Sequence, residues 1–500
     1  MRKVNKSHRK PVVRKSEVKR SHQIIEPMQS TDTHEIINNE DMEKPKKHRT
    51  WLVVIVILIF IVAMAALSFF VWKKYFDNSN KAVSPVKQVE LTKPPEIQTG
   101  KIISTEPVQS FTAAQTLAQI KQTNKAFNLP VNFGYKKQTI RFNTSDGTSN
   151  EVLVYAKVYV PDNAVAQKTP VMSFATGTTG IGDICASSIE QPTKRNWANY
   201  DSQLAAYVSQ GYIVVVTDYE GMRDDSRMHH YMVGELEGKA VLDSIQALNN
   251  LDITKSNVDK NAVFVAGYSQ GGHAAYWADA LAAKYAPNIK IAGAVGFGPV
   301  TSVSETLTSA ITNGANINWF GPFVISSYQD WYKRKYPVDR ILLPKWINNL
   351  NTDVANVCID NVNQFYPSNI GANRSSALYT TEFINAAKTG NIANNSIYAQ
   401  FASDMDSNLI GSVKTDTPKL INHGAYDNVV LPTQSKSAYS RLCSSGNKTT
   451  LKEYTTSPFA VQTYNPKGLV DHYQTMNASL NDTITWFNEI RTGTNKPGCN

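Results

Sequence analysis

The chain has few cysteines and histidines, and this scarcity narrows the chemistry that it supports. Four cysteines occur in 500 residues and none forms a CxxC pair, so neither a zinc site nor a thioredoxin-type site is indicated. No HExxH, GxGxxG or P-loop motif occurs. The side chains of the adjacent His229 and His230 point apart on any regular element. We therefore expect no metal and no cofactor.

An excess of charge is also missing from most of the chain. The formal charge is +10, but residues 1–50 hold 13 Lys and Arg against 7 Asp and Glu, and Lys73 and Lys74 add two more positive charges. Residues 1–50 are polar and poor in aromatics, which is typical of a disordered tail. Basic clusters of this kind bind anionic lipid or nucleic acid. A solvated tail beside a membrane is the simpler interpretation, and we expect no nucleic-acid partner.

Residues 51–72 form the one long hydrophobic run, WLVVIVILIFIVAMAALSFFVW, without charge, Pro or Gly. A helix of about 20 such residues spans a bilayer, and a Trp at each end suits the two interfaces. The run is too long, and too far from the start, for a cleavable signal peptide, and a buried soluble helix is the weaker alternative. The basic tail predicts a cytoplasmic N-terminus. The rest of the chain would then be extracytoplasmic, at the cell surface or in the periplasm.

Residues 73–109 are Pro-rich and unpatterned, and we interpret them as a stalk. From residue 110 to 500 the pattern changes to apolar strands alternating with amphipathic helices. The expected strands are 152–160, 170–175, 212–217, 262–266 and 291–297, and the expected helices between and after them are 233–248 and 273–284. This alternation predicts an α/β domain with a mainly parallel central sheet covered by helices on both faces.

The candidate nucleophile is Ser269, in the GxSxG sequence at 267–271. The motif alone is a weak signal, and an ordinary Gly-rich turn is the alternative. Here it stands between the strand AVFVA and an Ala-rich helix, which is the strand–turn–helix setting of a nucleophile elbow. A serine needs a base to act as a nucleophile.

The order of residues along the chain selects the partners of Ser269. In this fold the acid and then the histidine follow the nucleophile. Asp427 follows the strand 418–422, and His472 is then the only histidine in the correct order, because His423 precedes the acid. The alternatives are a turn-forming Asp427 and a helix-start His472. Asp471 is a poor acid for an adjacent imidazole, since neighbouring side chains diverge.

Acyl transfer also needs donors to the oxyanion. We expect the backbone N–H of Gln270, the residue after the nucleophile, to be one of them. The second is expected from the loop 174–180, with Gly177 or Thr178 as the donor and a merely flexible glycine loop as the alternative.

Four segments resemble the secretory lipase family, of the Candida antarctica lipase A type within the α/β-hydrolases. They are GYSQGGHAAYWA at the elbow, YIVVVTDYEGM and GELEGKAVLDSIQALNN before it, and TGTTGIGDICASS, which looks like the family's oxyanion loop. The resemblance runs from about residue 110 to the C-terminus. It implies that Ser269, Asp427 and His472 form the triad, and that residues of about 300–415 form a helical cap inserted into the catalytic domain.

The resemblance also implies a pairing of the cysteines. From the residues alone, an exported domain with four cysteines allows two disulfides in three connectivities, whereas a cytosolic one keeps four thiols. The family's order implies bridges between Cys185 and Cys358 and between Cys443 and Cys499. The chain departs from the family in the oxyanion loop, where fungal members carry an acidic residue and many bacterial ones carry His-Gly.

These features predict a serine carboxylic ester hydrolase, a lipase or esterase acting on acyl esters, with triacylglycerols among its candidate substrates. A peptidase or amidase is the first alternative, because a fold does not determine the leaving group. A catalytically inactive, membrane-tethered binding protein is the second.

Overall fold

The computed structural model describes residues 99–500, apart from 149, 163–167, 224–226, 255–256, 313–314, 316, 368–374, 464, 497 and 500. The predicted tail at 1–50 and the predicted membrane span at 51–72 lie outside these residues. Within the described part of the chain, no helix is both long enough and apolar enough to cross a membrane. The anchor at 51–72 therefore stays a prediction from sequence.

A single twisted sheet organises the described residues. Its order is β1-β3-β4-β6-β5-β7-β8-β9-β10, and β2 pairs with β3. The strands from β6 through β10 in this order run parallel, and β1, β2, β3 and β4 pair antiparallel. Their bounds are β1 Ile102–Thr105, β2 Gln109–Phe111, β3 Tyr135–Ser145, β4 Glu151–Pro161, β5 Thr169–Ala175, β6 Ile213–Thr217, β7 Val258–Tyr268, β8 Ile291–Phe297, β9 Lys419–Gly424 and β10 Thr449–Tyr454.

The prediction of a mainly parallel α/β sheet is confirmed. Two short strands lie at the predicted end of the stalk. The short strands β1 and β2 lie within or across the end of 73–109 and pair with β3. Their side chains are almost all exposed, because β1 is an edge strand. A strand exposed on both faces has no alternation of apolar and polar residues, so its sequence resembles that of a linker.

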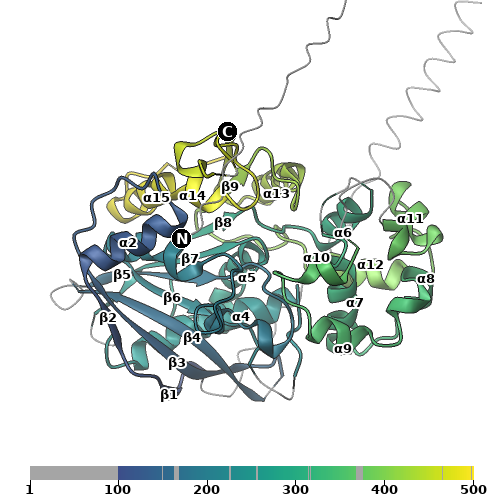
Figure 1. Ribbon diagram of the computed structural model, residues 1–500, viewed down its shortest axis with the longest axis horizontal. Coiled ribbons are helices and arrows are strands. Elements are labelled where there is room, and N and C mark those ends of the chain that lie inside the picture. Colours follow the sequence, from purple (N-terminus) through teal and green to yellow (C-terminus); the bar gives the residue numbers. More distant parts are fainter. Residues whose placement is uncertain are drawn as a thin grey trace, which may run out of the picture. The chain divides into compact units, whose positions relative to one another are not determined.

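Helices cover both faces of the sheet (Figure 1). One core joins α4, α5 and α13 to side chains such as Val171 and Val263, and the other joins α2, α3 and α15 to the alternate side chains, such as Met172 and Phe264. This alternation follows from the two-residue period of a strand. The helices are α2 Ala113–Thr123, α3 Tyr200–Ser209, α4 Gly234–Asn250, α5 Gln270–Tyr285, α13 Pro432–Ser444, α14 Thr475–Ala478 and α15 Leu480–Thr492, with short 3-10 turns at Asp183–Cys185, Ser187–Ile189 and Pro458–Ala460.

Between β8 and β9 the chain leaves the sheet and forms a helical insertion, drawn in green in Figure 1. Its core also includes residues from outside the insertion, among them Ile181, Tyr231 and Leu236. Aromatic residues of the insertion, including Phe320, Phe323 and Tyr328, are buried in that core. Its elements are α6 Val303–Thr312, α7 Phe320–Trp331, α8 Val338–Ile341, η4 Pro344–Trp346, α9 Leu350–Ala355, α10 Val362–Phe365, η5 Ser375–Ala377, α11 Thr381–Lys388 and α12 Ala399–Asp406.

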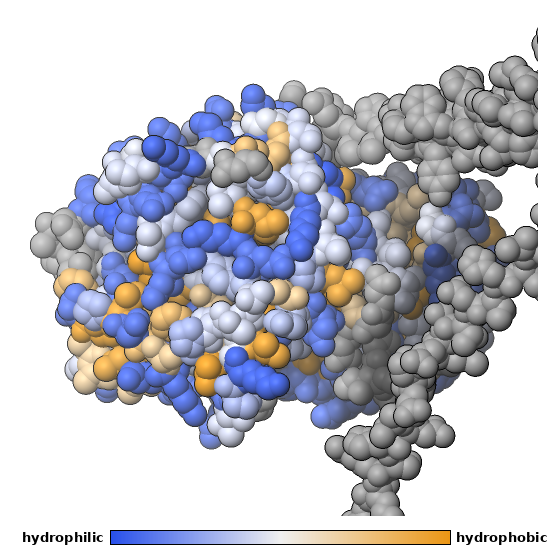
Figure 2. Space-filling model, turned by 90° about the horizontal axis from the view of Figure 1, so that it is seen from above, coloured by the Kyte–Doolittle hydropathy of each residue, from blue (hydrophilic) through white to orange (hydrophobic). Residues whose placement is uncertain are grey.

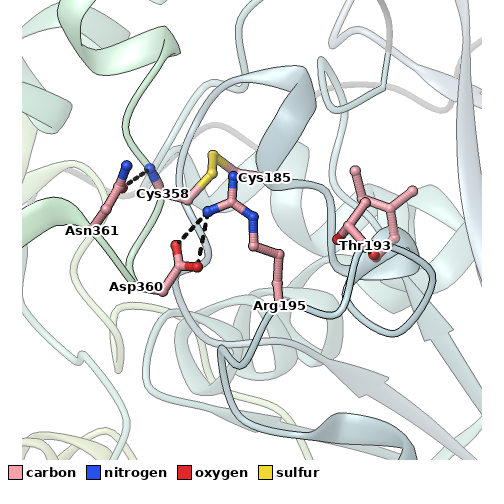
Figure 3. Close-up of a disulfide and its surroundings, with 7 residues drawn as sticks. Cys185, Thr193, Arg195, Cys358, Asp360 and Asn361 are labelled. Carbon is pink, nitrogen blue, oxygen red and sulfur yellow. Dashed lines mark hydrogen bonds and ion pairs between the residues drawn. A yellow bond between two sulfur atoms is a disulfide. The ribbon is translucent and has the colours of Figure 1, made fainter.

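Both disulfides implied by the family resemblance are present, Cys185–Cys358 and Cys443–Cys499. The first joins the segment after β5 to the helical insertion (Figure 3). Beside it, the guanidinium of Arg195 donates to both carboxylate oxygens of Asp360, at 3.1 and 2.9 Å. The disulfide and the ion pair thus attach the insertion to the sheet domain.

The face of the molecule shown in Figure 2 is mostly hydrophilic, and its hydrophobic residues form several small patches.

Candidate active site

Ser269 stands in the sharp turn between β7 and α5. Its φ of 56° and ψ of −115° place a non-glycine residue in a sparsely populated backbone region. Such strain persists only where the surroundings hold it. The amide of Ser269 donates to the carbonyl of Phe297 at the end of β8 (2.9 Å), and its carbonyl accepts from the amide of Val300 (3.1 Å). The turn is therefore held by the neighbouring strand.

The two motif glycines are required by close backbone approaches. A Cβ at Gly267 would lie 1.9 Å from the carbonyl oxygen of Gly271, and a Cβ at Gly271 would lie 1.9 Å from that of Ala175. Any side chain at either position would collide with backbone. This is the physical reason for the spacing of glycines around Ser269, and it supports the nucleophile-elbow interpretation of the motif.

Asp427 and His472 form a direct hydrogen bond, although 45 residues separate them. Asp427 lies in the loop after β9 and His472 in the loop before α14, and the ring Nδ1 is 2.7 Å from the carboxylate Oδ2. Because a carboxylate accepts, Nδ1 is the donor, and Nε2 is left free to act on another group. The structure thus brings the two predicted partners of the nucleophile together.

The Asp427–His472 pair lies beside the elbow. The ring of His472 packs on that of Tyr268, the residue before Ser269, with the ring centroids 4.9 Å apart. Gly298, which follows β8, also lies close to the pair, since a Cβ there would be 3.1 Å from His472 Nδ1 and 3.2 Å from Asp427 Oδ2. The exposed fractions of Ser269, Asp427 and His472 are 8%, 4% and 3%, so the three side chains are shielded from bulk solvent.

Asp427 is held as a carboxylate by its surroundings. Its Oδ1 accepts from the amides of Val429 and Val430, both at 2.9 Å, and His423 Nε2 lies 3.1 Å from its Oδ2. Burial would raise the pKa of Asp427, but His472 and His423 outweigh that effect and hold the pKa well below its ordinary value. The group that orients His472 therefore stays charged.

The predicted oxyanion donors lie on two segments that meet at the elbow. Gln270 is the first residue of α5, where the backbone N–H has no partner within the helix and the helix dipole favours negative charge. The loop after β5 lies against Tyr268, because a Cβ at Gly177 would be 2.7 Å from its ring. The amide of Gly177 already donates to the Tyr200 hydroxyl (2.8 Å). This favours Thr178 over Gly177 as the second donor.

Comparison with known proteins places the chain in a family. The model of the secretory lipase family matches residues 198–497, which are 300 of the 500 residues and include Ser269, Asp427 and His472. The chain belongs to the secretory lipase family. This confirms the resemblance drawn from the four sequence segments.

Curated relatives of the chain match over part of their length. Lipase 1 of Candida albicans is 28% identical over 326 residues, which cover 61% of this chain and 63% of that protein. Lipase A of Moesziomyces aphidis is 31% identical over 177 residues, covering 34% of this chain and 36% of that protein. The chain thus aligns with less than two thirds of the length of either relative.

Solved structures share the fold of the chain. Candida antarctica lipase A in its closed state superposes with a TM-score of 0.56 at 18% identity, covering 84% of this chain and 89% of that one. A ligand-bound form of the rice cell wall degrading esterase LipA from Xanthomonas oryzae gives a TM-score of 0.63 at 16% identity, covering 80% and 100%. At these identities the likeness shows the α/β-hydrolase fold alone.

Sequence reasoning missed a second polar cluster, which lies behind the elbow. It consists of the buried side chains Glu237 on α4, His229 before α4, and Gln270 and His273 on α5. A signal was present, since Glu237 falls on the apolar face of α4 beside Leu236, Ala240 and Val241. A charged residue on such a face requires buried partners.

The adjacent histidines diverge, as the sequence predicted. His229 turns towards the elbow, and His230 bridges Glu220 and Asp330 of α7. Within the described residues, no group of three or more His, Cys, Asp or Glu is arranged to hold a metal ion.

Proposed function

We propose that the protein is a serine carboxylic ester hydrolase with Ser269 as nucleophile, His472 as general base and acid, and Asp427 as the residue that orients His472. The observation that carries this proposal is the buried Asp427–His472 hydrogen bond of 2.7 Å, packed through Tyr268 against the strained turn that holds Ser269. Membership of the secretory lipase family supports it.

The chemistry follows from the donor and acceptor roles in the site. His472 donates from Nδ1 to Asp427, so its Nε2 is the atom that takes the proton of Ser269 as the oxygen attacks the ester carbonyl. The backbone N–H groups of Gln270 and Thr178 stabilise the oxyanion that forms. His472 then returns the proton to the leaving alcohol. In the second half of the reaction His472 deprotonates water, which attacks the acyl-enzyme, and the proton then returns to the oxygen of Ser269 as the acid leaves.

The substrate class comes from the relatives. A protein of Malassezia furfur that is 32% identical over 165 residues is named a secreted triacylglycerol lipase. We propose acyl esters, including triacylglycerols, as substrates of this chain. The apolar run at 51–72 supports a membrane anchor that keeps the hydrolase outside the cytoplasm, where both disulfides are stable.

The test uses the full-length chain in detergent. The wild type is expected to react with a fluorophosphonate probe and to hydrolyse p-nitrophenyl esters, and Ser269→Ala is expected to lose the label and on the order of 10⁶ in turnover. Esters of increasing chain length separate an esterase from a lipase, and matched anilides report amidase activity.

Ser302 provides a matched control, because it is a buried serine near the sheet edge that no step of the mechanism uses. Ser302→Ala is expected to keep both label and turnover. A folded wild type that neither labels nor hydrolyses any ester would refute the enzyme and leave a membrane-tethered binding protein.

A further inference from the structure

Glu237 is a fully buried carboxylate directly behind the nucleophile elbow. Its Oε1 accepts from the side-chain Nε2 of Gln270 (2.7 Å) and from the amide of Met232 (3.0 Å), and its Oε2 accepts from Nδ1 of His273 (2.7 Å). Its side chain is 0% exposed. A buried charge without such partners would be strongly destabilising. Two of its three donors belong to the first turn of α5, whose N-terminal amide is a proposed oxyanion donor.

Both side-chain amide hydrogens of Gln270 have buried partners. One amide hydrogen goes to Glu237, and the other goes to Nε2 of His229, at 2.8 Å. His229 accepts at Nε2 because its Nδ1 faces the carbonyl oxygen of Glu220 at 3.1 Å and must donate there. Burial lowers the pKa of His229, in agreement with a ring that accepts a hydrogen bond.

The contacts continue from His229 to the other half of the oxyanion hole. The ring of His229 stacks on that of Tyr219, with centroids 4.9 Å apart and planes within 12°. The hydroxyl of Tyr219 donates to the carbonyl of Thr176 at 2.6 Å. Thr176 precedes Gly177 and Thr178 in the loop after β5. A continuous set of buried contacts thus connects Glu237, through Gln270, His229 and Tyr219, to both backbone segments that supply the oxyanion donors.

We propose that Glu237 is a positioning residue that keeps the two backbone N–H groups of the oxyanion hole, those of Gln270 and Thr178, in fixed positions relative to each other. It touches neither substrate nor Ser269, and acts by orienting the Gln270 backbone and, through His229 and Tyr219, the loop of Thr178. The inference rests on the proposed function. Oxyanion donors contribute to the transition state rather than to substrate binding, so losing their alignment lowers kcat and leaves KM nearly unchanged.

The main test compares two isosteric substitutions on α4 in the full-length protein. Glu237→Gln places an amide N–H against Gln270 and Met232 or against His273, all of which are donors. It is expected to lower kcat by about 10- to 100-fold, less than outright deletion of an oxyanion donor, with KM changed less than about twofold. Asp243→Asn is the control, because Asp243 is equally buried on α4 but bonds to Thr144 and Tyr285, away from the elbow. It is expected to keep kcat.

A second measurement separates positioning from folding. A boronic acid forms a tetrahedral adduct with a catalytic serine, so its affinity is expected to fall with Glu237→Gln by the same factor as kcat. Tyr219→Phe removes one hydroxyl, keeps the ring stack, and remains informative if Glu237→Gln does not fold. It is expected to lower kcat by about 3- to 10-fold, in line with the loss of one hydrogen bond.

In the double variant Glu237→Gln/Tyr219→Phe, the loss is expected to be smaller than the product of the single losses, because both act on one set of contacts. A lowered melting temperature with unchanged kcat and boronate affinity, or an equal loss of kcat in Asp243→Asn, overturns the inference. If the wild type itself fails to hydrolyse esters, it is the proposed function that fails.

Discussion

Two buried carboxylates lie near the elbow of Ser269, and each lies close to two histidines. Asp427 contacts His472 and His423 from the loop after β9. Glu237 contacts His273 at 2.7 Å and lies 3.7 Å from His229, both behind the elbow. The chemistry of the two clusters is almost the same, but the geometry differs. Among the described residues, Nε2 of His472 has no protein partner, whereas the rings around Glu237 have both nitrogens in contact with protein groups.

This difference teaches how one kind of interaction serves two roles. A histidine with a free ring nitrogen beside a nucleophile is able to move a proton. A histidine with both nitrogens engaged holds backbone and side chains in place. Whether the carboxylate is Asp or Glu does not decide between proton transfer and positioning. The contacts of the second ring nitrogen of each histidine decide it.

The largest expected effect comes from removing the charge of Asp427. Asp427→Asn presents an amide N–H to His472 and favours the wrong tautomer, so kcat is expected to fall about 10⁴-fold, as for the corresponding change in other serine hydrolases. Steady-state measurements of kcat for Asp427→Asn and Glu237→Gln, made side by side, compare the roles of the two carboxylates directly. Equal losses in the two variants would contradict the assignment of different roles.

A smaller effect is expected from His423, the second histidine of Asp427. His423→Asn removes the contact of Nε2 with Oδ2 at 3.1 Å and its contact with the carbonyl oxygen of Val430 at 2.9 Å. The amides of Val429 and Val430 and the ring of His472 still hold Asp427. We expect kcat to fall by about tenfold, the value of one hydrogen bond to a charged group. A loss as large as that of Asp427→Asn would show that His423 shares the proton transfer.

The smallest effect is expected from His230, where a third histidine bridges carboxylates across the boundary with the helical insertion. Its Nδ1 is 2.9 Å from Glu220 and its Nε2 is 2.8 Å from Asp330, with Arg227 and Lys333 beside these carboxylates. Burial lowers the pKa of His230, but the bonds to Glu220 and Asp330 outweigh it and raise the pKa. Because the folded pKa is raised, the stabilisation is complete below the ordinary value of about 6.5 and is lost as the pH rises through the folded pKa.

His230→Gln is therefore expected to lower the melting temperature by about 1 °C at pH 6 and by less at pH 9, since a partly exposed pair contributes about 1 kcal/mol or less. Tryptophan fluorescence during heating measures the difference, and His423→Asn at the same two pH values serves as the comparison. An equal shift at both pH values would show that the His230 contact is not linked to protonation.

Local sequence determined the sheet and the triad candidates. The apolar runs at 213–217 and 262–266 form buried parallel strands, and the strand at 291–297 lies where the pattern predicted it. Ser269 was found because an elbow leaves a short-range signature of glycines between a strand and a helix. Asp427 and His472 followed from chain order, which topology imposes on this fold.

The tertiary structure alone decided which side chains meet. Glu237 reaches Gln270 and His273 over 33 and 36 residues, the Gly177 amide is taken by Tyr200, and His423 lies beside Asp427 although chain order set it aside. The hydrophobic periodicity of a helix or strand shows which of its faces is buried, because that pattern lies within the element's own sequence. Contacts between faces depend on how α4 and α5 pack on the sheet and on each other, and that information is spread over the whole core.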